Sequence, residues 1–134
     1  MLFLIVASCG TSKTVHSKTI FRHINLGKYG RIELGDKMTN LESLVVVKNN
    51  RFYLKENTFG GAHSIEVKTN KNSIIDEFIF DYGQSQTFES KVNDYLELGI
   101  PKKENNKAIW NDGKTEFSIY VLNRNLFSKM KRLK

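Results

Sequence analysis

Residues 87–122 read TFESKVNDYLELGIPKKENNKAIWNDGKTEFSIYVL, and this stretch carries the clearest structural signals in the chain. It opens with an apolar stripe at helical spacing, formed by Phe88, Val92, Tyr95 and Leu96. Thr87 is suited to cap the first turn of a helix, and Gly99, in the left-handed conformation, with Pro101 is suited to end it. The pattern therefore predicts one main helix over residues 87–98.

A hairpin is predicted directly after a polar loop at residues 102–107. Residues 108–110 are apolar, Asp112-Gly113 is a strong signal for a tight turn, and residues 114–122 alternate between apolar and polar. Residues 123–134 are basic, and we expect them to form a tail with a short helix.

Upstream of the helix, short β-prone runs alternate with turn residues. We expect one or two strands within 19–34, and strands at 51–55, 64–68 and 74–82. Residues 39–48 fit either a brief helical turn or a strand from Leu44 to Lys48, ahead of a turn at Asn49-Asn50. The predicted fold class is α+β: an antiparallel sheet of hairpins with the main helix on one face, as a two-layer sandwich.

The N-terminal residues predict where in the cell the protein resides. An apolar run ends in the only cysteine of the chain, and Val6-Ala7-Ser8-Cys9 resembles the lipobox of bacterial lipoproteins. This resemblance implies a signal peptide at 1–8, a lipid on Cys9, a tether over 9–18, an α+β domain over 19–123 and a basic tail over 124–134. Gly10, rather than Asp, follows Cys9, which by resemblance to lipoprotein sorting implies the periplasmic side of the outer membrane. The alternative is that Leu2–Val6 is a buried strand.

Composition narrows the class of protein. A chain of 134 residues allows one domain, and a single cysteine excludes an intramolecular disulfide. The net charge of +7 includes a C-terminal cluster that could contact anionic lipid, made up of Lys129, Lys131, Arg132 and Lys134. No nucleic-acid-binding motif accompanies this charge.

The second half of the chain also resembles a known family. The order of a helix, Leu98-Gly-Ile-Pro101 and Trp110-Asn-Asp-Gly-Lys-Thr115 is similar to small periplasmic lipoproteins of the SmpA/OmlA type. These share their fold with the β-lactamase-inhibitor-protein superfamily. The resemblance implies helix-and-hairpin units that bind other proteins.

Catalytic signals are weak. The three histidines, His16, His23 and His63, have no metal-ligand spacing, and neither a nucleophile motif nor a phosphate-binding loop occurs. We expect no enzyme activity, cofactor or metal. The candidate contacts for a protein partner are aromatic: Tyr53 and Tyr120 on the open sheet face, with Trp110 at a strand end.

These signals predict a lipid-anchored envelope protein with a partner-binding domain. Two alternatives remain. One is an inhibitor or immunity-type protein that binds a secreted enzyme or toxin. The other is a small enzyme or ligand-binding domain whose pocket would bring His63 together with Asp81 or Glu77.

Overall fold

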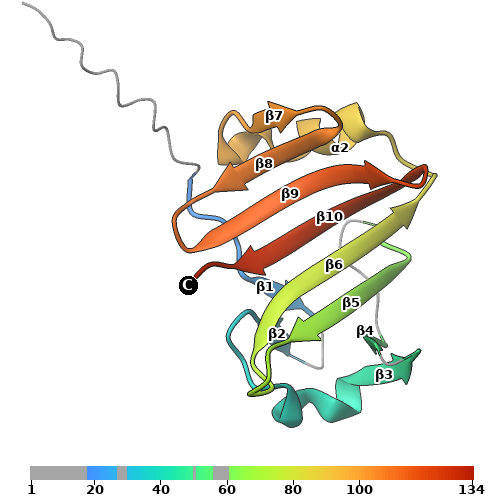
Figure 1. Cartoon of the computed structure of the whole chain (residues 1–134), viewed down its shortest axis with the longest axis vertical. Helices are drawn as coiled ribbons and strands as arrows, with labels where there is room; N and C mark the ends of the chain where they lie inside the picture. The colour runs from blue at the N-terminus through green and yellow to red at the C-terminus, as the bar shows by residue number, and fades with distance from the viewer. Residues whose placement is uncertain (1–17, 27–29, 50, 56–60) are drawn as a thin grey trace, which may run out of the picture.

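The computed structural model describes residues 18–26, 30–49, 51–55 and 61–134. Within these residues the chain forms an eight-stranded antiparallel sheet, a two-stranded sheet, one short α-helix and two 3₁₀ helices (Figure 1). The elements are, in order, β1 (His23–Asn25), β2 (Arg31–Glu33), η2 (Met38–Leu44), β3 (Val45–Lys48), β4 (Arg51–Leu54), β5 (Ser64–Thr69), β6 (Ile75–Gly83), α2 (Phe88–Asn93), η3 (Leu96–Leu98), β7 (Lys102–Glu104), β8 (Lys107–Asn111), β9 (Thr115–Leu122) and β10 (Asn125–Arg132).

The predicted fold class is wrong, because the fold is mostly β and has no main helix. The strands of the large sheet lie in the order β3-β4-β5-β6-β10-β9-β8-β7. The α-helix covers only residues 88–93 and is followed by the 3₁₀ turn η3. A sheet of this size with one short helix is not a two-layer α+β sandwich.

The predicted helix cap is correct, but the helix ends early. Thr87 Oγ1 accepts a hydrogen bond from Ser90 N at 3.2 Å. The later residues that pack on the core, Tyr95 and Leu98, lie in a turn and in the 3₁₀ helix η3 rather than in a continued α-helix. Gly99 has φ 114° and ψ −177°, so it is extended with a positive φ and does not form the expected left-handed cap.

Strand β10 replaces the expected basic tail and short helix at residues 124–134. It lies between β6 and β9, and it pairs with both of them antiparallel. Asn123 and Arg124 both have positive φ, 52° and 70°, which is the conformation of a tight type I′ hairpin turn. This turn sends the C-terminal residues back along β9.

The remaining strand predictions are largely confirmed. Strands form within 19–34 and at 51–54, 64–69 and 75–83, and Asn49 has the positive φ of a hairpin turn. Residues 38–48 contain both of the expected alternatives, because η2 is followed directly by β3. The prediction of a polar loop at 102–107 is wrong, since residues 102–104 form the edge strand β7. Its three exposed charged residues carry no apolar signal, but they suit an unpaired sheet edge.

A register shift changes the faces of β6. Regular alternation along residues 74–82 would place Ile75 and Phe78 on opposite faces, yet both are fully buried. The pairing between β5 and β6 is irregular at Lys68 and Thr69, where one residue of β5 spans two of β6. Such a bulge reverses the alternation of side chains, so both residues reach the core.

The core lies on one face of the large sheet. Phe78, Met130, Phe117 and Trp110 form a row across four neighbouring strands, and each is at most 1% exposed. The β1–β2 hairpin and α2 cover this face with Ile24, Ile32 and Val92, and Figure 1 shows them behind the sheet. The other face of the sheet has no such layer among the described residues.

The position of β10 gives a stability prediction. Met130→Ala removes a fully buried side chain from the central row of the core, so we expect a loss of about 2–5 kcal/mol in the free energy of unfolding. Lys131→Ala, on the opposite face of the same strand, should change it by less than about 0.5 kcal/mol. Urea unfolding of both variants measures the difference, and equal losses would contradict the assigned faces of β10.

Candidate binding surface

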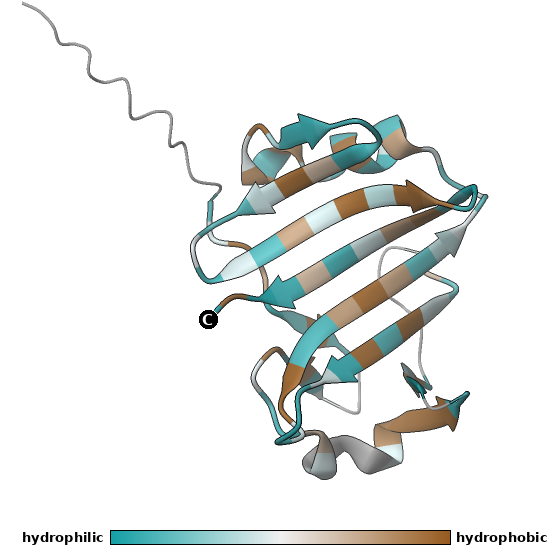
Figure 2. Ribbon diagram, viewed as in Figure 1, coloured by the Kyte–Doolittle hydropathy of each residue, from teal (hydrophilic) through white to brown (hydrophobic). Residues whose placement is uncertain are grey.

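The uncovered face of the large sheet carries alternating charges. In the row nearest the start of β9, Lys68, Glu77, Lys131 and Glu116 lie opposite one another on β5, β6, β10 and β9. Opposite charges at directly paired positions stabilise neighbouring strands. Figure 2 shows the hydrophilic residues that interrupt the apolar ones along these strands. This face is therefore solvated, and its charge is locally balanced.

Two aromatic rings break this polar surface. Tyr120 of β9 and Phe127 of β10 are directly paired, and their rings stack with centroids 5.5 Å apart at an angle of 15°. Lys129 Nζ lies 5.8 Å from the centroid of the Tyr120 ring, within reach of a cation–π interaction. Burial raises the pKa of the Tyr120 hydroxyl, and the charges of nearby carboxylates raise it further. The hydroxyl is therefore neutral at physiological pH and can donate a hydrogen bond.

A groove adjoins this aromatic pair and is lined by Tyr120 and Lys129. It has a volume of about 570 Å³ and runs between the β7–β8 turn at Asn105 and Asn106 and the end of β9. Val121 and Leu122 also line it, and they are 37% and 55% exposed. Half-buried aromatic rings beside exposed aliphatic side chains and amides are typical of protein-binding surfaces. We call this region the aromatic groove.

Tyr53 lies in a second groove, on the β3–β4 side of the sheet. Val46, Lys55 and His63 also line this groove, which measures about 630 Å³. Tyr53 is half-buried and pairs with Glu66 of β5. Since three strands, β5, β6 and β10, separate β4 from β9 in the order of the sheet, the structure does not bring Tyr53 and Tyr120 together.

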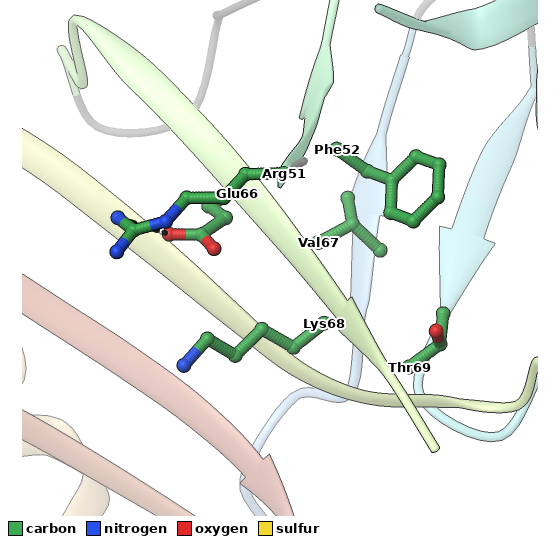
Figure 3. Close-up of a pocket in the computed structure, with 6 residues that line it drawn as sticks. All are labelled: Arg51, Phe52, Glu66, Val67, Lys68 and Thr69. Atoms are coloured by element: carbon green, nitrogen blue, oxygen red, sulfur yellow. Dashed lines mark ion pairs between the residues drawn. The ribbon is translucent and has the colours of Figure 1, made fainter. Parts of the chain in front are cut away.

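A smaller hollow lies at the β4–β5 junction (Figure 3). Arg51, Glu66 and Lys68 extend to one side of β5, whereas Phe52 and Val67 extend to the other. Arg51 Nη1 lies 3.8 Å from Glu66 Oε1. A single carboxylate that is already paired with an arginine does not form an acid–base couple, so we assign no chemistry to this hollow.

Trp110, the third residue expected to bind a partner, belongs to the core instead. It is 1% exposed, and its indole Nε1 donates a hydrogen bond to Gly99 O at 2.9 Å. Its ring also lies edge-on to Tyr95. The sequence suggested a strand end, but β8 continues to Asn111 and directs Trp110 inward.

The C-terminal basic residues do not form a free cluster for lipid. Arg132 donates from Nε and Nη2 to Asp76 Oδ1, at 3.1 and 2.9 Å. Lys131 lies between the paired positions of Glu77 and Glu116. Lys129 lies in the aromatic groove, and Lys134 is exposed at the end of the chain. Because β10 spreads these residues over two faces of the sheet, they present no concentrated positive patch.

His63 is brought next to Asp81, but through the backbone. His63 N donates to Asp81 O at 2.6 Å, while the Asp81 carboxylate accepts from Gly83 N at 2.8 Å. The described part of the chain contains no group of three or more His, Cys, Asp or Glu residues placed to hold a metal ion. Cys9 and His16 lie outside the described residues.

A buried polar cluster beneath α2 could not be recognised from the sequence. Lys91 is 3% exposed, and its Nζ lies 4.1 Å from the centroid of the Tyr82 ring. The Tyr82 hydroxyl forms a 2.8 Å hydrogen bond with Ser128 Oγ on β10. Desolvation lowers the pKa of Lys91, and burial raises the pKa of Tyr95 to about 12. Because these groups are enclosed, we assign the cluster the role of holding α2 against the sheet.

Comparisons with known proteins add no assignment: no family model, no curated protein and no solved structure matches the chain.

Proposed function

We propose that this chain is a lipid-anchored cell-envelope protein that binds another envelope protein without catalysis. The half-buried Tyr120–Phe127 stack on the uncovered face of the sheet is the observation that carries the binding part. The adjoining groove combines the Tyr120 ring with exposed aliphatic side chains, two asparagine amides and the charged residues Glu104, Lys107 and Lys129. Such surfaces bury well against a protein partner, because the rings contribute a large contact area at a small cost in side-chain entropy.

The anchor part of the proposal comes from the sequence. Val6-Ala7-Ser8-Cys9 resembles a lipobox, and Gly10 after the cysteine supports the periplasmic side of the outer membrane. In the described part of the chain, no helix is both long and apolar enough to cross a membrane. A lipid on Cys9 would supply the attachment, and residues 10–17 would connect it to the folded domain.

Lipid labelling tests the anchor. With the gene and its upstream region expressed in a bacterial host, we expect the protein to incorporate labelled fatty acid and Cys9→Ser to lose all of the label. Cys9→Ser leaves the folded domain intact, so its unfolding transition is the control. Equal labelling of both proteins, or labelling of neither, would contradict the anchor.

Photo-crosslinking in the same cells tests the aromatic groove. We expect a photoreactive phenylalanine analogue at position 120 to give a discrete adduct with one envelope protein, because the side chain lines the groove. The matched control is position 72, an exposed turn residue outside the groove. An adduct of equal yield at position 72, or no adduct at position 120, would argue against the groove as the binding surface.

A further inference from the structure

One apolar side chain is far more exposed than the others. Ile100 is 90% exposed, and no other described large hydrophobic residue exceeds 59%. Leu96, in the adjoining turn η3, is 47% exposed. Val46-Val47 and Val121-Leu122 also expose neighbouring aliphatic side chains, but only the segment Leu96–Ile100 carries one that is almost entirely in water. This exposure indicates that the segment has an apolar surface to contact.

The backbone holds Ile100 outward on a fixed segment. On its N-terminal side, Gly99 N donates to Leu96 O at 3.0 Å, and Gly99 O accepts from the buried Trp110 indole. On its C-terminal side, Pro101 is buried. Because the residues on both sides of Ile100 are held in place, the fold itself keeps the Ile100 side chain exposed.

The first described residues of the chain, beginning at Lys18, join the domain next to this same segment. Lys18 N donates to Leu98 O at 2.9 Å, and Ile20 N donates to Asp112 Oδ2 at 2.8 Å. Lys18 lies nine positions after Cys9 in the sequence, and an extended chain covers about 3.5 Å per residue. A lipid on Cys9 would therefore lie within roughly 30 Å of Lys18, whose backbone is hydrogen-bonded to Leu98.

The charged side chains next to the segment Leu96–Ile100 do not favour an anionic partner. Lys102 Nζ lies 3.5 Å from Glu104 Oε1, and Lys103 Nζ lies 3.8 Å from Glu89 Oε1. These lysines are matched by carboxylates, so an anionic partner would gain little here. The apolar side chains are what the segment offers.

We infer that the segment Leu96–Ile100 is the part of the domain that contacts the lipid bilayer, with Ile100 inserted at the boundary between headgroups and acyl chains. This inference rests on the proposed lipid at Cys9. A covalent anchor keeps the segment at a high local concentration near the bilayer, so even a small apolar contact orients the domain.

The orientation has a consequence for the aromatic groove. Strand β9 begins at Thr115, close to the β8–β9 turn that binds Ile20, and ends at Leu122 in the groove. Seven steps along an antiparallel strand cover roughly 24 Å. With Ile100 in the bilayer, the Leu122 end of the groove lies farthest from the membrane and is open to a partner.

A fluorescent probe at position 100 tests the inference on the full lipidated chain. A lipid on Cys9 consumes the only thiol, so Ile100→Cys offers a single site for an environment-sensitive nitrobenzoxadiazole dye. The matched control is Leu122→Cys, which labels another exposed aliphatic position at the far end of β9. Both proteins are placed in vesicles of phosphatidylcholine and phosphatidylethanolamine, and mass spectrometry verifies the lipid on Cys9.

We expect the emission at position 100 to shift to shorter wavelength and to be quenched by nitroxide lipids, with neither effect at position 122. If Cys9 carries the lipid and position 100 behaves as in water, the docking inference fails while the anchor stands. Equal shifts at both positions would also overturn it, because the domain would then have no preferred orientation. Absence of lipid on Cys9 would overturn the anchor and, with it, the docking.

Discussion

The structure depends on the pairing of β10 with both β6 and β9. The chain first forms the meander β3–β6 and later the meander β7–β9, and only β10 connects them within the sheet. Its buried residues Leu126, Ser128 and Met130 complete the core between the two halves. Without this strand, β6 and β9 would each expose an unpaired edge and a row of apolar side chains.

Both surfaces that we interpret functionally follow from this arrangement. The β9–β10 pairing sets Tyr120 against Phe127 and so creates the aromatic groove. The core face that β10 completes is covered by η3 and α2, whose connection to β7 leaves Ile100 in solvent. One end of the domain receives the chain at Lys18, and the other end carries the groove. The proposed membrane anchor and the proposed binding surface would use this separation.

Local signals in the sequence predicted the hairpins well, because turn chemistry and side-chain alternation act over few residues. Asn49 adopts the expected positive φ, and Asp112 Oδ1 accepts hydrogen bonds from Lys114 N and Thr115 N in the β8–β9 turn. The Thr87 cap is likewise local. The position of Tyr120 on the open face also follows from the alternation along residues 114–122.

The incorrect predictions share one physical cause, which is contact between segments that lie far apart in the sequence. In β10, a buried serine occupies the central core position, and its hydroxyl is satisfied by Tyr82, which lies 46 residues away in the sequence. The Asn123–Arg124 turn lacks glycine, so it gave no hairpin signal. The burial of Lys91 against Tyr82 and of Trp110 against Gly99 also depends on segments that meet only after folding.

Amide hydrogen exchange of the full chain tests the central position of β10 most directly. Strand β10 is hydrogen-bonded on both sides, so its amides should exchange only through global unfolding, with the free energy measured by urea denaturation. The amides of the edge strand β7 should exchange faster. Exchange of residues 125–132 at the rate of an unstructured tail would contradict this fold and the groove built upon it.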